Sequence, residues 1–371
     1  MFREVIGVKQ NLEKTRARFL QALAIGVCYV WLIVRPEDAS RAAVGALSLC
    51  AKVIVPSLFP FFVCANLFCA LHLTQPLERA LSGIMQPVFG VPGSGAAALV
   101  VGLTGGYPSG AQTIAALYAA GSIDKKTAGR LLLFCNNCGP AFIFGVVGPA
   151  VFGSRLAGLL LYLVHCTSAL LLGILPRKKA VVLLSENAAA AQESPPSYSA
   201  AFTASVKKAG QTALEVCMFV LLFGVLTALV QSALQVFLPP WALTAAAGIL
   251  ELSGGAGALA ELALTQRVKF TLASMLLAFG GLSVHAQTKA VLTPAGLGSL
   301  PVFLPKLLHA LTAGLLSIPV YLLFEAQLAS SAVFAACGTG AGFALTELVL
   351  GVLACPIFRK MAASNLRRNR V

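Results

Sequence analysis

Two helix-breaking segments recur in each half of this chain, at nearly the same separation. They are residues 102–110 (GLTGGYPSG) and 134–140 (FCNNCGP) in the first half, and 248–255 (GILELSGG) and 279–287 (FGGLSVHAQ) in the second. Each lies within an apolar stretch, where backbone released from a helix is tolerated only inside protein or beside a water-filled cavity. Matched interruptions in two halves of a chain are typical of a transporter binding site.

The composition places the chain in a membrane. Of its 371 residues, 58% are hydrophobic and only 11% are charged, with a mean hydropathy of +0.86. Soluble domains carry about a quarter charged residues. Strand-like alternation does not recur at ten-residue intervals, which disfavours a β-barrel. We therefore predict an all-α polytopic membrane protein.

The net charge of +14 is concentrated at the two ends of the chain. Five basic residues precede the first apolar run and five follow the last one. Flanking charges of this kind hold a terminus in the cytoplasm, so we expect both termini to be cytoplasmic in a multi-pass protein of the cell membrane. Binding of nucleic acid or of a specific lipid is the alternative explanation of the charge, and we expect no nucleic-acid partner.

Apolar runs and polar segments divide the chain into five parts. The run Phe19–Val34 is interpreted as a retained signal-anchor helix rather than a cleaved signal peptide, because no clear cleavage site follows it. Pro56 and Pro60 are expected to divide the segment 41–73 into a tilted or interfacial helix and a spanning helix. The other strong spans are Gly158–Leu175, Val216–Leu234, Leu307–Phe324 and Gly338–Phe358. The predicted parts are an anchor helix (1–39), a first repeat (40–175), a polar linker (176–208), a second repeat (209–325), and a C-terminal helix with a basic tail (326–371).

The repeats are predicted to be inverted, with re-entrant hairpins and broken helices. Glycines permit the tight turn of a hairpin tip, and a proline fixes the turn and removes a donor. Exposed amides and carbonyls at such breaks can hold an anion or a cation. The candidate substrate-binding residues are Gly105, Gly106, Pro108, Ser109, Gly110, Asn136, Asn137, Gly280, Gly281, Ser283, His285 and Gln287. We expect the segments 105–110 and 280–283 to approach one another in the middle of the membrane.

Glu251 and His285 are the candidate ion-coupling residues. An intramembrane carboxylate is costly and usually functional, and an imidazole titrates near neutrality. The structural alternatives are that Glu251 bonds a neighbouring helix and that His285 is a neutral, satisfied imidazole. Lys289 and Lys306 would add a positive charge if either faces the cavity. The other histidines of apolar spans, His165 and His309, have weaker individual claims to a role.

The ten cysteines are scattered through apolar segments, which indicates packing in lipid rather than a disulfide framework. Cys135 and Cys138 form a CxxC, but no second pair of ligands stands at zinc spacing. We therefore expect no metal and no cofactor, apart from a coupling proton or sodium ion.

The motifs 105–111, 136–140 and 279–287 resemble those of sporulation integral membrane proteins of the YlbJ type. That family carries two nucleoside-recognition "Gate" domains and is similar in architecture to concentrative nucleoside transporters, which bind substrate between two hairpins and two broken helices. The resemblance covers most of residues 40–325. It implies a link to endospore formation and to movement of dipicolinic acid, and it would place the candidate residues around a substrate cavity.

The predicted function is secondary transport of a small polar or anionic metabolite, dipicolinate-like or nucleoside-like. The alternative is a non-transporting scaffold or assembly factor of sporulation membranes. The sequence has no His-Glu-x-x-His, Gly-x-Ser-x-Gly or Walker loop, so we expect neither an enzyme nor coupling to ATP. The drive must then be an ion gradient, the substrate's own gradient or a partner. Expected partners are membrane lipid, a small-molecule substrate, and a second copy of the chain or other sporulation membrane proteins.

Overall fold

The computed structural model describes residues 2–71, 73–174 and 197–335, and every regular element in those ranges is a helix. Five of these helices are long and apolar enough to cross a membrane: Pro36–Ala70, Arg155–Ile174, Tyr198–Leu234, Gln266–Leu292 and Phe303–Leu328. The predicted all-α polytopic membrane architecture is confirmed. The expected span Gly338–Phe358 lies outside the described residues.

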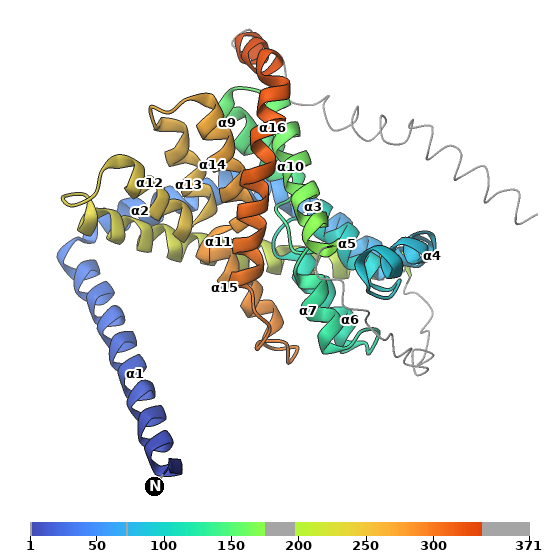
Figure 1. Ribbon diagram of the computed structural model, residues 1–371, viewed down its shortest axis with the longest axis horizontal. Helices are drawn as coiled ribbons and strands as arrows, with labels where there is room; N and C mark the ends of the chain where they lie inside the picture. The colour runs from blue at the N-terminus through green and yellow to red at the C-terminus, as the bar shows by residue number, and fades with distance from the viewer. Residues whose placement is uncertain (1, 72, 175–196, 336–371) are drawn as a thin grey trace, which may run out of the picture.

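Helix α1 (Phe2–Val34) extends away from the rest of the molecule (Figure 1). Its apolar half, Arg18–Val34, is shorter than the five long spans and leaves large side chains such as Ile25 and Tyr29 exposed. The helix ends at Val34, because Pro36 disfavours helical backbone in the residue before it, and Arg35 has φ −126° and ψ 54°. The exposed apolar surface fits a helix surrounded by lipid.

The segment containing Pro56 and Pro60 does not divide into two helices as expected. Helix α2 (Pro36–Leu49), the π-helical turn η1 (Cys50–Ile54) and α3 (Val55–Ala70) form one continuous span. Pro56 falls in the first turn of α3, and the wider π-helical turn just before it absorbs the missing backbone donor. The prediction of separate interfacial and spanning helices is therefore wrong.

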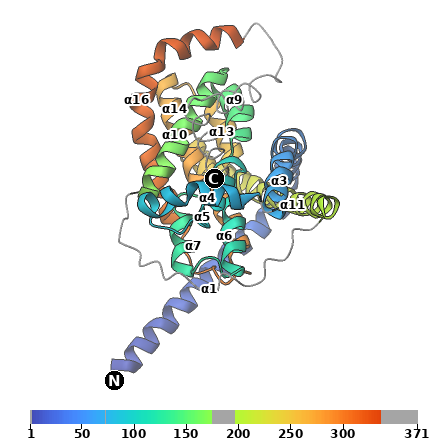
Figure 2. The same ribbon diagram turned by 90° about the vertical axis from the view of Figure 1, so that its right-hand side faces the viewer.

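Helix α11 (Tyr198–Leu234) begins within the predicted polar linker, so residues 198–208 of that segment are helical. Ser197 caps the helix by accepting a hydrogen bond from the Ala200 N–H at 3.4 Å. The basic pair Lys207 and Lys208 is thus carried on a helix. The small buried residues of α11 pack this helix against α2 and α3. In Figure 2, α3 and α11 are seen nearly end-on.

The remaining elements follow the same order in the two halves. The first half contains α4 (Thr74–Ile84), η2 (Met85–Phe89), α5 (Gly95–Thr104), α6 (Ser109–Ala119), α7 (Lys125–Leu132), α8 (Pro140–Phe142), η3 (Ile143–Val147), α9 (Gly148–Phe152) and α10 (Arg155–Ile174). The second contains α12 (Pro240–Leu250), α13 (Leu252–Glu261), α14 (Gln266–Phe279), α15 (Gly281–Leu292) and α16 (Phe303–Ala335). In each half a helical hairpin precedes an interrupted helix, and a long helix follows.

The long helices of the two halves pack together. Helix α16 lies against α14 and α10, and in both views this group runs across the direction of α3 and α11 (Figures 1 and 2). Helix α16 continues beyond residue 325, where the second repeat was expected to end. The hydrophobic core around these helices includes an edge-to-face contact between the rings of Phe152 and Phe270, which come from different halves of the chain. The two hairpins and the two breaks are held against this group.

Candidate functional site

The first hairpin, α5–α6, turns at residues 105–108. Gly106 adopts φ +78°, a left-handed conformation that side chains rarely tolerate, and the bond between Tyr107 and Pro108 is cis. The second hairpin, α12–α13, turns at the single extended residue Glu251, with φ −143° and ψ 126°. The two helices of this hairpin approach so closely that an ideal Cβ at Gly255 would lie 2.3 Å from the Cα of Gly248. Both tips fall where the sequence predicted an interruption.

The first break is the non-helical chain between α7 and α8, residues 133–139. Pro140 begins α8 and holds Gly139 extended. Asn137 donates through Nδ2 to the Phe134 carbonyl at 2.6 Å, and the Cys138 N–H donates to His165 Nε2 at 3.0 Å. Side chains thus replace hydrogen bonds that a continuous helix would have made.

The second break lies between α14 and α15, where Gly280 and Gly281 have φ +82° and +76°. The last carbonyls of α14 need partners outside the helix. Tyr107 donates to the Leu277 or Ala278 carbonyl, at 3.2 or 3.4 Å. His285 Nε2 donates to the Phe279 carbonyl at 3.0 Å. One partner comes from the first hairpin tip, so this tip and the second break lie together, as the sequence predicted.

The first hairpin holds the first break by backbone contact. An ideal Cβ at Gly102 would lie 1.7 Å from the Cys135 carbonyl oxygen, and one at Gly110 would lie 1.8 Å from it. An ideal Cβ at Gly106 would lie 3.1 Å from the backbone nitrogen of Gly139. The Cys135 carbonyl therefore sits between α5 and α6. The sequence indicated a tight turn at Gly110 but not this use of the two helical glycines.

Lys306 lies where these parts meet. It is 2% exposed, and its Nζ donates to the Asn136 carbonyl and to the Tyr107 hydroxyl, the latter at 3.1 Å. The ammonium also lies 4.8 Å from the centre of the Tyr107 ring. Asn136 Nδ2 donates to Thr288 Oγ1 on α15 at 2.9 Å. Among the described residues no carboxylate pairs with Lys306, so its charge is uncompensated.

Two buried histidines, His165 on α10 and His309 on α16, lie beside this lysine, with ring centres 4.7 Å apart. Their hydrogen bonds fix opposite tautomers. His165 Nε2 accepts from the Cys138 N–H, so its proton is on Nδ1; His309 Nε2 bonds the His165 carbonyl, so it carries the proton. Both Nδ1 atoms lack a hydrogen-bond partner in the part of the chain that the structure describes. The pair therefore offers one free donor and one free acceptor.

The predicted substrate-binding residues fall on the first tip and the start of α6, in the first break, and at the second break and along α15. Ser109 Oγ donates to the Gly105 carbonyl at 3.4 Å, and Gln287 Nε2 donates to Ser283 Oγ at 3.3 Å. The side-chain oxygens of Asn136 and Asn137 are buried without a partner among the described residues. We therefore define the central site by Tyr107, Asn136, Asn137, Thr288 and Lys306. Sequence reasoning missed Tyr107 and Thr288, although a tyrosine inside a glycine-rich tip was a usable signal.

Glu251 lies apart from these contacts. It is 5% exposed, and its Oε2 accepts a hydrogen bond from the Gly254 N–H at 2.6 Å, which caps α13. The side chain also lines a cavity of about 610 Å³ between α2, α11 and the second hairpin. Lys289 bonds the Gly298 and Leu300 carbonyls, at 2.7 and 2.6 Å, and so stabilises a turn. No cluster of three metal-ligating side chains occurs in the described ranges.

No family model and no solved structure matches the chain. Among curated proteins, the chain is similar to the "Sporulation integral membrane protein YlbJ" of Bacillus subtilis (strain 168). The two are 29% identical over 319 residues, which is 76% of this chain and 77% of the other. The resemblance seen in the motifs is confirmed by this similarity.

Proposed function

We propose that this chain, which is similar over 76% of its length to a sporulation integral membrane protein, is a secondary transporter of a small carboxylate anion. The substrate class is dipicolinate-like, and the setting is a membrane of a cell that forms endospores. The central site takes the anion. Transport is driven by an ion gradient, by the substrate's own gradient or by a partner.

The uncompensated charge of Lys306 carries this proposal. A buried ammonium loses its hydration, and here it regains one carbonyl, one hydroxyl and the face of a ring. None of these is an anion, and buried charges in proteins are normally paired. A substrate carboxylate would supply the missing negative charge and a charge-assisted hydrogen bond. A neutral nucleoside would not, which favours the anionic substrate class.

The position of Lys306 gives the anion a way to affect the conformation. Its Nζ contacts the first break at Asn136 and the first tip at Tyr107, and Tyr107 in turn contacts the second break. A carboxylate that replaces either acceptor loosens one of these contacts. Binding at Lys306 would thereby be linked to the arrangement of both halves, as transport requires.

The test compares Lys306→Gln with a matched variant, Lys289→Gln. Purified proteins are screened for thermal stabilisation by dipicolinate and by nucleosides, and for dipicolinate uptake in proteoliposomes. A hydrogen bond to a charged group contributes about 1.5–3 kcal/mol, so Lys306→Gln should lose about tenfold or more in affinity. Lys289→Gln should keep wild-type affinity, because its ammonium bonds only a turn.

The variant Asn137→Ala is a second test of the anion site, at the first break. Asn137 bonds the Phe134 carbonyl and presents its other amide atom without a partner, so the variant should insert normally but take up dipicolinate more weakly. Equal dipicolinate affinity in wild type and Lys306→Gln would refute the anion site. Stabilisation by nucleosides alone would favour the nucleoside-like substrate, and no ligand effect in any protein would favour the scaffold alternative.

A further inference from the structure

A second feature, separate from the central site, is the cavity between α2, α11 and the second hairpin. Its volume is about 610 Å³, which is ample for several water molecules and a small ion. Its walls are mainly apolar, with polar groups at intervals. The polar or charged residues that line it are Asp38, Arg41, Thr227, Gln231, Ser232, Gln235 and Glu251.

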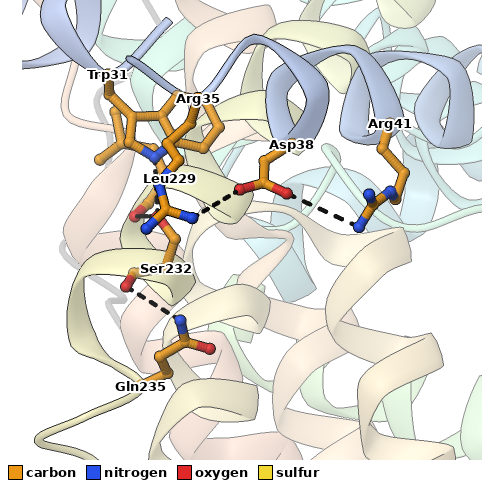
Figure 3. A network of polar contacts seen from close by, with 7 residues as sticks. All are labelled: Trp31, Arg35, Asp38, Arg41, Leu229, Ser232 and Gln235. Atoms are coloured by element: carbon orange, nitrogen blue, oxygen red, sulfur yellow. Dashed lines mark hydrogen bonds and ion pairs between the residues drawn. The ribbon is translucent and has the colours of Figure 1, made fainter.

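The charges that line the cavity are unequally compensated. Asp38 is paired with both Arg35 and Arg41, at 3.6 and 3.7 Å, so its charge is satisfied (Figure 3). Glu251 has no cationic partner among the described residues and bonds only neutral groups. The remaining titratable or charged groups near it are Arg41 on α2 and the Cys50 thiol in η1, while α11 contributes neutral side chains. The cavity therefore ends at an unpaired, buried carboxylate.

Polar side chains continue along α11 toward the pair formed by α1 and α2. Ser232 accepts a hydrogen bond from Trp31 Nε1 at 2.9 Å, and Gln235 donates to the Ser232 carbonyl at 3.4 Å (Figure 3). Arg35 and Arg41 are well exposed beside them, with side-chain exposures of 64% and 78%. The cavity thus runs from exposed charges at the start of α2 to the buried Glu251.

Glu251 and Lys306 are linked through the second break. An ideal Cβ at Gly281 would lie 3.3 Å from the Glu251 Cα, and one at Gly280 would lie 3.4 Å from the Tyr107 ring. Tyr107 in turn accepts the hydrogen bond of Lys306. The backbone of Glu251 and the ring of Tyr107, which bonds Lys306, therefore contact one glycine pair from different elements.

We propose that the cavity is the aqueous path by which a monovalent cation, a proton or sodium, reaches Glu251, separately from the anion at Lys306. This inference rests on the proposed function for its role in transport. The cation neutralises Glu251 while the substrate carboxylate neutralises Lys306. Both binding events act on the Gly280–Gly281 break, so one monovalent cation crosses together with each substrate anion.

The experiment uses two glycines that both have open space around them. No heavy atom lies within 4 Å of an ideal Cβ at Gly45 or at Gly210, but only Gly45 lines the cavity. Gly45→Phe places a ring in the proposed path, and Gly210→Phe is the matched control. Glu251→Gln removes the charge at the inner end. Each variant is first compared with wild type by size-exclusion chromatography and circular dichroism.

Cation binding is measured without the anion, so the result does not depend on transport. Radioactive sodium is used for the sodium case, and infrared difference spectra of the carboxylic C=O stretch on acidification for the proton case. Wild type and the control Gly210→Phe should show the signal. Glu251→Gln should lose it, and Gly45→Phe should lose it or reach it about tenfold more slowly.

In proteoliposomes, Gly45→Phe and Glu251→Gln should lose ion-driven accumulation of dipicolinate yet keep thermal stabilisation by dipicolinate. A full cation signal at the wild-type rate in Gly45→Phe, a full signal in Glu251→Gln, or no signal in wild type would overturn the cavity proposal. Cation binding through Glu251 in a wild-type protein that binds no anion would instead support the cavity proposal and reject the proposed function.

Discussion

Replacing Gly110 with alanine should force the first hairpin away from the first break. The new methyl carbon would lie 1.8 Å from the Cys135 carbonyl oxygen. Carbon and carbonyl oxygen are in contact at roughly 3.3 Å, so α6 and the break must separate by roughly 1.5 Å. Backbone stands on both sides of the contact, and no side chain can rotate away to relieve it.

The magnitude follows from two opposing effects. Overpacking a well-packed core costs about 1–3 kcal/mol, and a backbone obstruction belongs at the upper end of that range. Alanine in a helix interior gains about 1 kcal/mol over glycine. We therefore expect a net loss of about 2 kcal/mol for Gly110→Ala. Gly210→Ala, which has no heavy atom within 4 Å of its new Cβ, should gain up to about 1 kcal/mol.

The assay is thermal unfolding in detergent micelles, followed by circular dichroism. Gly102→Ala meets the same Cys135 oxygen from α5, at 1.7 Å. Once one methyl group has moved the break, the second costs less, so the double variant should lose less than the sum of the two single losses. An unfolding midpoint of Gly110→Ala equal to that of Gly210→Ala would show that the reasoning about the shared carbonyl is wrong.

Three further predictions concern single contacts. Hydrogen bonds from Thr127 lower the pKa of Asp124, which caps α7 at 2.7 Å, so Asp124→Ala should cost about 1 kcal/mol near neutral pH. The difference in stability between wild type and Asp124→Ala should vanish as the pH falls through the lowered pKa of Asp124. Equal unfolding midpoints of the two proteins at neutral pH would contradict this prediction. Tyr107→Phe should slow dipicolinate uptake and lower stability by about 1 kcal/mol, measured by flux and unfolding, because it removes one of the two acceptors of Lys306 and the donor to a carbonyl of α14. Lys289→Ala should lower the unfolding midpoint while leaving uptake unchanged; a selective loss of uptake would place Lys289 in the site.

The interruptions could be read from sequence because their causes are local. Gly280 and Gly281 adopt positive φ, and Pro140 cannot continue a helix from the residue before it. Pro56 misled the same reasoning, because the neighbouring π-helical turn keeps the helix continuous through the proline. The start of α11 could not be predicted from composition, because its polar first turns resemble a linker, while Ser197 acts as a helix cap.

The membership of the central site could be predicted only in part. Asn136 and Asn137 stand out as polar groups beside a glycine and a proline within an apolar segment. Lys306 was one of several charged residues in apolar spans, and its contact with Asn136 joins residues 170 positions apart in the chain. The tautomers of His165 and His309 depend on a backbone amide and a carbonyl brought to them by folding. No local pattern encodes such contacts.

The Cys135 carbonyl held between Gly102 and Gly110 makes the two hairpins mechanically unequal. The first hairpin and the first break are in close backbone contact, which blocks movement of the break along either helix of the hairpin. The second hairpin meets its break less closely, because an ideal Cβ at Gly281 would lie 3.3 Å from the Glu251 Cα, and beside the hairpin lies open volume. The interruptions have matching spacing in the two halves, but the two hairpins are packed differently and are not expected to move equally. We expect the second hairpin to be the part that swings, and the first to be the frame against which it closes.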